Sequence, residues 1–144
     1  MNLEYNEITN IKENSFIGLH NLISNNQIPE IKKNSLSGLN NLREIIMDYN
    51  HLTEIEENSF TGLNNLLVLG LRCNQITEIK HNSFSGLSNL EKLNLAKNQL
   101  TVIKENSFTG LNNLRILNLA QNQITEIKGN LFSGCKSYCC IKIR

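Results

Sequence analysis

Residues 59–80 read SFTGLNNLLVLGLRCNQITEIK, and residues 107–128 read SFTGLNNLRILNLAQNQITEIK. The two stretches differ only within residues 67–73 and 115–121, and they are identical on both sides of that window. A chain that preserves long flanks and varies a short middle is typical of a repeated scaffold that presents a changing segment. The fold prediction therefore starts from the repeat.

The repeat is regular, because Asn50, Asn74, Asn98 and Asn122 stand 24 positions apart and the phenylalanines from Phe60 onward keep the same interval. Each unit follows LxxLxLxxNx(I/L)xxIxxxxFxxLxx. We interpret residues 1–144 as one domain of about six repeats, in which 138–144 begin a seventh. The six repeats are a partial unit at 1–21, a shortened unit at 22–41, and units at 42–65, 66–89, 90–113 and 114–137.

Within a unit, the LxLxxN segment predicts a short strand followed by a turn. Leucine alternates with other residues, as in Leu93-Asn94-Leu95, which suits a strand with one buried face. The asparagine that follows carries both a hydrogen-bond donor and an acceptor. In a stack of units these asparagines would form a ladder that satisfies buried peptide groups inside the bend.

The rest of each unit, such as TEIKHNSFSGLSN at 77–89, returns the chain to the next strand. We expect its isoleucine, phenylalanine and leucine side chains to point inward and its lysine, glutamate, asparagine and serine side chains to meet water. Gly62, Gly86 and Gly110 limit any helix there to a short turn. Stacking buries the apolar side chains that one unit cannot bury alone. The predicted class is α/β in the horseshoe sense, with parallel strands on the concave face and turns or 3-10 segments on the convex face.

This pattern resembles the leucine-rich repeat family. The 24-residue form with phenylalanine is similar to the "typical" subclass found in Toll-like receptors, Slit-like proteins and small extracellular proteoglycans. The resemblance covers nearly the whole chain, and it implies a secreted or cell-surface setting. It implies a scaffold and not a particular ligand.

The two ends and the second unit depart from the pattern. Met1 stands where a strand leucine is expected, and Tyr138, Ile141 and Ile143 match the opening of a seventh unit, so both ends look cut. The family's cysteine-bearing caps are not visible. Asn26 follows Asn6 sooner than the repeat interval requires, which puts Asn21 at a core position and predicts a distorted strand or a deletion. We interpret Pro29 as a surface residue in a turn.

The positions between the strand leucines predict a partner-binding face, because they change while the scaffold repeats. The predicted site residues are Ile46, Asp48, Tyr49, Val68, Arg72, Lys92, Asn94, Lys97, Ile116 and Asn118. Acidic residues lie toward the first half of this face and basic residues toward the second, which would orient a complementary partner. The alternative is that these positions drift without selection.

Composition and motifs argue against several other classes. The net charge of +1 leaves no basic footprint for nucleic acid, and no apolar run approaches the ~20 residues of a membrane helix. The three histidines are scattered, and no catalytic set, phosphate loop or cofactor motif appears. Cys135 replaces a core leucine and is interpreted as a small buried hydrophobe. A disulfide from Cys135 to Cys139 or Cys140 is the alternative, and the spacing suits zinc poorly.

We therefore predict a non-enzymatic module that binds a protein, or less readily a glycan, without cofactor or metal. The alternative is a structural element or degenerate fragment whose exposed repeat ends pair chain to chain. The family resemblance implies an extracellular or cell-surface location. The given chain begins without a signal-peptide pattern, and a cytoplasmic location stays open.

Overall fold

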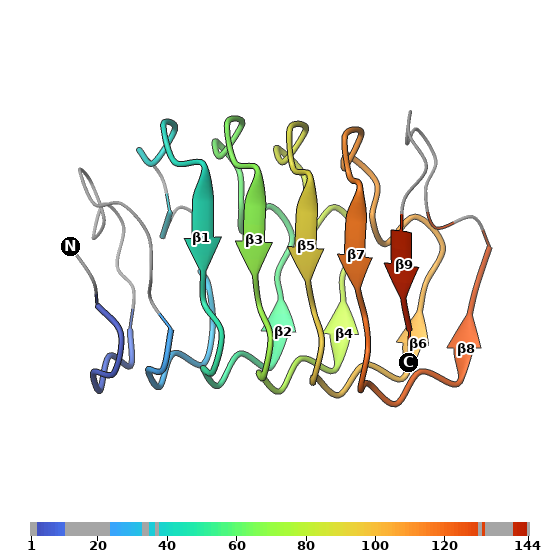
Figure 1. The fold of residues 1–144 in the computed structure, drawn as a ribbon, viewed down its shortest axis with the longest axis horizontal. Helices are drawn as coiled ribbons and strands as arrows, with labels where there is room; N and C mark the ends of the chain where they lie inside the picture. Colours follow the sequence, from blue (N-terminus) through green and yellow to red (C-terminus); the bar gives the residue numbers. More distant parts are fainter. Residues whose placement is uncertain are drawn as a thin grey trace.

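The structure is a computed structural model that describes residues 3–10, 24–32, 35–36, 38–129, 131 and 140–143. Stacked coils of the chain form a solenoid, and from the third unit onward each coil contributes one strand to a parallel sheet (Figure 1). The strands of this sheet lie in chain order, as β1 (Glu44–Ile46), β3 (Val68–Gly70), β5 (Lys92–Asn94), β7 (Ile116–Asn118) and β9 (Cys140–Lys142). The predicted leucine-rich repeat solenoid is confirmed.

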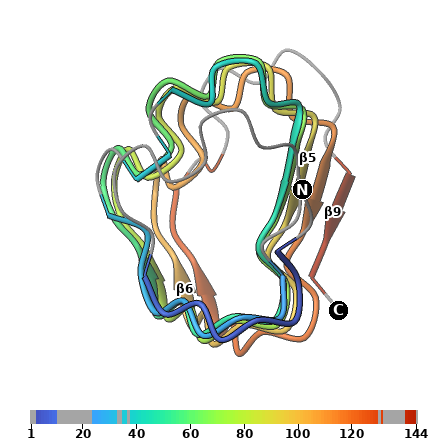
Figure 2. The ribbon, with the colours of Figure 1, turned by 90° about the vertical axis from the view of Figure 1, so that its left-hand side faces the viewer.

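The side of the coils opposite the sheet carries shorter strands separated by turns (Figure 2). These strands are β2 (Glu54–Ile55), β4 (Glu78–Ile79), β6 (Val102–Ile103) and β8 (Glu126–Ile127), paired as β2 with β4 and β6 with β8. The sequence pattern did not predict them. The predicted turns follow, as in Leu63, whose N–H donates to the Phe60 carbonyl at 3.2 Å. Gly62 between them has a φ of 93°, which favours glycine.

The sheet pairs each residue with its equivalent in the next repeat. Leu69 lies opposite Leu93, and Leu93 lies opposite Leu117. Because every inward leucine or isoleucine lies opposite an aliphatic residue of the next coil, one strand face is buried from β1 to β7 and the other face is free. On β9, Ile141 is 39% exposed. Residues that are one repeat length apart in the sequence are therefore paired across neighbouring strands of the sheet.

The interior consists of columns of equivalent side chains. Phe60, Phe84 and Phe108 stack with ring centroids 6.0 Å and 5.8 Å apart, and all three are buried. Burying one such side chain is worth roughly 1.5–3 kcal/mol relative to exposure. The columns link neighbouring coils, since no single coil encloses its own apolar side chains.

The predicted asparagine ladder is present. The Ile76 N–H donates to Asn98 Oδ1 at 3.0 Å, and Asn98 Nδ2 donates to the carbonyls of Leu71 and Leu95 at 2.9 and 3.0 Å. Asn74 and Asn122 repeat this arrangement between their own neighbouring coils. Each amide therefore satisfies backbone groups of two coils at once.

A second ladder corrects the expectation that the serines of the return segment meet water. Ser59, Ser83 and Ser107 are buried, with at most 4% of each residue exposed. The Ser83 hydroxyl lies 2.8 Å from the Ile55 carbonyl of the preceding coil and 2.7 Å from the Lys80 carbonyl of its own coil. Serine is buried here because its small hydroxyl satisfies carbonyls that the turn leaves unpaired.

The described parts of the first two units also stack on their neighbours. The Ile8 N–H donates to Asn26 Oδ1 at 3.1 Å, and the Ile28 N–H donates to Asn50 Oδ1 at 3.2 Å. The shortened second unit is thus in register with the third from residue 24 onward. Pro29 is exposed. Asn21, at which the shortened unit was expected to break the core, lies outside the described residues.

Candidate functional site

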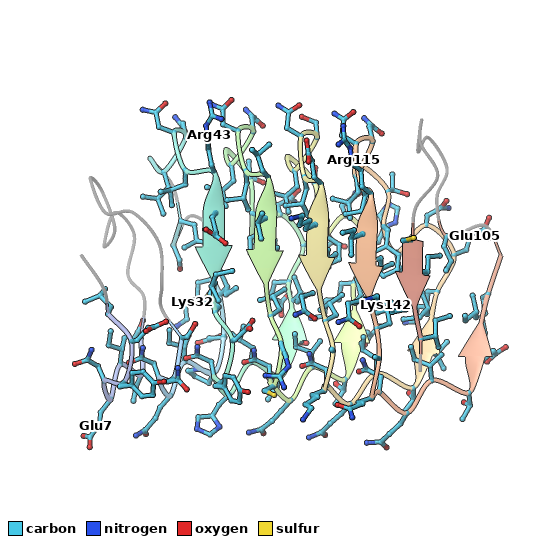
Figure 3. The ribbon with its side chains drawn as sticks, viewed as in Figure 1. Glu7, Lys32, Arg43, Glu105, Arg115 and Lys142 are labelled. Atoms are coloured by element: carbon cyan, nitrogen blue, oxygen red, sulfur yellow. The ribbon has the colours of Figure 1, made fainter. Side chains whose placement is uncertain are left out.

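The strand face is the outward side of the sheet β1-β3-β5-β7-β9 together with the turns that follow its strands. Side chains on it form rows across the strands, since every strand pairs with equivalent residues of the next coil. One row runs through Ile46, Gly70, Asn94, Asn118 and Lys142. Lys142 lies on β9 toward the end of the sheet, as labelled in Figure 3.

A groove of about 240 Å³ crosses β1, β3, β5 and β7 on this face. Seven of the ten predicted site residues line it, namely Ile46, Asp48, Val68, Lys92, Asn94, Ile116 and Asn118. The residues Leu69, Gly70 and Leu93 complete the lining. The predicted residues Tyr49, Arg72 and Lys97 do not line the groove.

Gly70 lies in the lining of the groove, on the strand between β1 and β5. It stands in a row whose neighbours carry Ile46 on one side and Asn94 on the other. Since Gly70 has no side chain, the Ile46 and Asp48 side chains of the preceding coil occupy the place that a side chain there would take. A Cβ at Gly70 would lie 2.8 Å from Asp48 Oδ1 and 2.9 Å from Ile46 Cδ1.

Asp48 takes over a hydrogen bond that asparagine makes elsewhere in the sheet. Asn94 Oδ1 accepts from the Ala96 N–H at 3.1 Å, two residues further along its own coil. In the coil of Gly70 the corresponding donor is the Arg72 N–H, which donates to Asp48 Oδ1 of the preceding coil at 2.8 Å. Burial raises the pKa of the half-buried Asp48 carboxyl, although the Arg72 hydrogen bond and charge oppose the shift.

Tyr49 and Arg72 form one unit beside the groove. The Arg72 guanidinium lies 5.1 Å from the centroid of the Tyr49 ring and donates to the Tyr49 hydroxyl. This hydrogen bond raises the pKa of Arg72 above its usual value. Tyr49 and Lys97 both follow their strands in the left-handed region, each with a φ of 57°. Both side chains stand on the outside of the turn, and Tyr49 is 47% exposed.

The charges of the strand face are unequal along the sheet. Lys92, Lys97 and Lys142 are exposed, and no ion pair engages them within the described part of the chain. Asp48 accepts the backbone hydrogen bond described above. Among the described residues of this face, the lysines that form no ion pair therefore lie on β5 (Lys92), on β9 (Lys142) and in the turn after β5 (Lys97).

Gly70 lines the groove, although the sequence prediction left it out of the site. A signal was present, because Gly70 is the single glycine in a column that otherwise holds Ile46, Asn94 and Asn118. Cys73 and Cys140 are free thiols. The predicted disulfide joins Cys135 to Cys139 or to Cys140. The free thiol of Cys140 contradicts the second pairing, and Cys135 and Cys139 lie outside the described residues. Among the described residues, no cluster of metal-binding side chains and no helix able to cross a membrane is found.

Comparisons with known proteins agree with this architecture. The leucine rich repeat family model matches residues 41–100 and 88–137. The structure is similar to a chain of the TLR13–ssRNA13 complex, with a TM-score of 0.78 and 33% identity over 86% of this chain and 18% of that chain. No curated protein sequence matches the chain.

A second similar structure is the glycosylated form of the Drosophila Toll–Spatzle complex. Its TM-score is 0.74, with 25% identity over 88% of this chain and 19% of that chain. The present chain thus spans about a fifth of the length of the two solved chains. The repeated pattern, the stacked coils and the family match together show that the chain belongs to the leucine-rich repeat family.

Proposed function

We propose that this chain is a non-enzymatic, receptor-like module that binds a protein partner through its strand face. The observation that carries the proposal is the groove across β1, β3, β5 and β7, which is lined by residues that vary between units. Varied side chains on a rigid repeated scaffold are how such solenoids build binding surfaces. The exposed Tyr49 and the adjacent Arg72 add an aromatic and a cationic group of the kind enriched in binding hot spots.

The similar structures support the class of function. In those structures TLR13 is in complex with single-stranded RNA and Toll is in complex with Spatzle. For this chain we propose an extracellular or cell-surface setting and a protein ligand. The net charge is +1, so the chain lacks the strong positive field that would draw a nucleic acid backbone.

The test is a photo-crosslinking amino acid at position 94, compared with one at Thr101 on the opposite side of the coil. Each protein would be exposed to extracellular fluid of the source organism, with and without two matched double variants. K92Q/K97Q removes two charges from the strand face, and K104Q/K128Q removes two charges elsewhere. We expect position 94 to capture a partner that Thr101 does not, and only K92Q/K97Q to lose it.

Two results would contradict the proposal. Capture that is equal at both positions would mean that the strand face is not the binding surface. Binding of a fluorescent single-stranded RNA with a steep salt dependence, lost in K92Q/K97Q, would replace the protein partner with nucleic acid.

Self-association is the second candidate function, and the last described coils favour it. Ile127, Ile141 and Ile143 are 44%, 39% and 41% exposed. Apolar side chains beside a strand edge favour pairing with another chain. Sedimentation velocity over a concentration series, with I141E as the variant, tests this candidate. Oligomers that I141E abolishes would support it, and a monomer at all concentrations would exclude it.

A further inference from the structure

We propose that the groove lined in part by Gly70 is an anchor pocket for one branched aliphatic side chain of the partner, with a neighbouring carboxylate of that partner bound by Lys92. This inference rests on the proposed function and specifies the chemistry of its ligand. The partner segment would carry leucine, isoleucine or valine next to an acidic group.

The shape of the groove selects a single side chain. Its volume of about 240 Å³ lies below the roughly 300 Å³ at which pockets for drug-sized molecules begin. It exceeds the about 150 Å³ of a cavity that holds one benzene molecule. Gly70 forms the buried floor, and an open groove of this size admits one aliphatic group together with part of its backbone.

The lining of the groove is apolar where that group would sit. Ile46, Val68 and Ile116 surround the floor, and Ile116 is 38% exposed. Covering these side chains with another aliphatic group would remove apolar surface from water on both partners.

The charges beside the groove favour an anionic neighbour. Lys92 lines the groove, is exposed and forms no ion pair with a described residue. Asp48, the acidic group of the lining, accepts the Arg72 N–H at 2.8 Å. A partner carboxylate near Lys92 therefore meets an available ammonium group, whereas a partner cation near Asp48 would compete with the Arg72 guanidinium and backbone.

The direct test uses small probes and methyl NMR of the full chain with labelled isoleucine, valine and leucine. N-acetyl-leucine carries the isobutyl group and the carboxylate. N-acetyl-leucinamide lacks the carboxylate, and N-acetyl-glycine lacks the isobutyl group. We expect N-acetyl-leucine to shift the methyl signals of Ile46, Val68 and Ile116 with a Kd on the order of 1 mM. The other two probes should bind several-fold more weakly.

Two variants test separately the contribution of the pocket and that of the Lys92 charge to binding. G70N introduces the residue that positions 94 and 118 already carry. Its side chain must displace the ends of the Asp48 and Ile46 side chains, both of which line the groove, so G70N should weaken the binding of N-acetyl-leucine at least tenfold. K92Q should weaken N-acetyl-leucine about threefold and leave N-acetyl-leucinamide unchanged. K104Q, outside the strand face, should change neither. G70A provides a smaller obstruction if G70N proves unstable, since the added Cβ meets the ends of the Asp48 and Ile46 side chains.

The pocket proposal is overturned if N-acetyl-leucine shifts none of these methyl signals, or if G70N binds it as well as the unmodified chain. Equal binding of N-acetyl-leucine and N-acetyl-leucinamide would overturn the role of Lys92. Photo-crosslinking at position 94 distinguishes a failure of the anchor pocket from a failure of the proposed binding by the strand face. If G70N still captures the partner and K92Q/K97Q does not, binding by the strand face stands and the anchor pocket is wrong.

Discussion

The Asp48 carboxylate lies where a side chain at Gly70 would stand, 2.8 Å from the position that a Cβ would take. The two residues belong to adjacent coils of the solenoid. Because position 70 is a glycine, Asp48 reaches across and accepts the Arg72 N–H at 2.8 Å. In the coils of Asn94 and Asn118 the same hydrogen bond stays within one coil. A single glycine thus lets an acid of the neighbouring coil enter the row and take over this hydrogen bond.

Replacing Asp48 by asparagine tests how much the half-buried carboxylate charge lowers the free energy of unfolding. Burial raises the pKa of Asp48 above its ordinary value of 3.8, so the ionised form is disfavoured in the folded protein. The stability associated with the protonated form is fully present below pH 3.8 and is lost as the pH rises through the folded pKa. D48N keeps an oxygen for the Arg72 N–H and carries no charge. We expect D48N to be more stable than the unmodified chain at pH 7, with a difference that disappears in acid.

Urea unfolding monitored by circular dichroism between pH 3 and 8 measures this difference. D48A is the control, because it removes the acceptor and should cost about 1 kcal/mol by leaving the Arg72 N–H without its partner. A D48N protein that is less stable than the unmodified chain at pH 7 would show that the charged hydrogen bond outweighs burial.

The asparagine ladder should be worth more than the asparagines that cap the turns. Asn98 is buried and makes three hydrogen bonds of 2.9 to 3.0 Å, to Ile76, Leu71 and Leu95, besides a longer one of 3.4 Å to the Ala96 carbonyl. We expect N98A to lower the free energy of unfolding by about 3 kcal/mol, at about 1 kcal/mol for each bond. Asn89 donates to the Asn64 carbonyl at 2.7 Å on an exposed turn, and N89A should cost about 0.5 kcal/mol. Equal losses in denaturant titrations would contradict a special role for the ladder.

The phenylalanine column should couple adjacent coils energetically. Phe60 and Phe84 stack with an interplanar angle of 4°. A double-mutant cycle with F60L and F84L should give a coupling of about 1 kcal/mol. The matched cycle with F60L and F108L should give a coupling near zero, because Phe84 stands between the two rings. Similar couplings in both cycles would mean that the coils respond as a whole and not through the ring contacts.

The return side offers a test of paired surface charges. Lys80 lies 2.9 Å from a Glu54 oxygen and 2.8 Å from a Glu56 oxygen. The Lys80 hydrogen bond lowers the pKa of Glu56 below 4.5, so this stabilisation is present above pH 4.5 and is lost as the pH falls through the folded pKa. We expect K80M to reduce the Tm at pH 7 slightly, and the effect to vanish in strong acid.

Salt should also shrink the effect of K80M, because both partners are exposed to solvent screening. K104M is the control, since Lys104 pairs with one described carboxylate, that of Glu78, and should lower the Tm less than K80M. A K80M effect that is unchanged by salt and pH would point to lost packing of the lysine stem in place of lost charge pairing.

Much of the architecture follows from the sequence alone. The regular period of the repeat predicts the order of the sheet and its register, because stacked coils place equivalent residues side by side. The asparagine ladder follows from the chemistry of an amide in a buried turn. The variable positions also identify most of the groove lining, because alternation along a strand sends every second side chain to the free face.

Only the tertiary structure decided the features that arise between coils. The burial of Ser83 and the short strands of the return side depend on which carbonyls the neighbouring coil leaves within reach. The lining of the groove brings together Gly70 of one coil and Asp48 of another. A repeat pattern states which residues are equivalent along the chain. Hydrogen bonds and cavities depend instead on the side chains that stacking brings together, and distances of a few ångströms decide those.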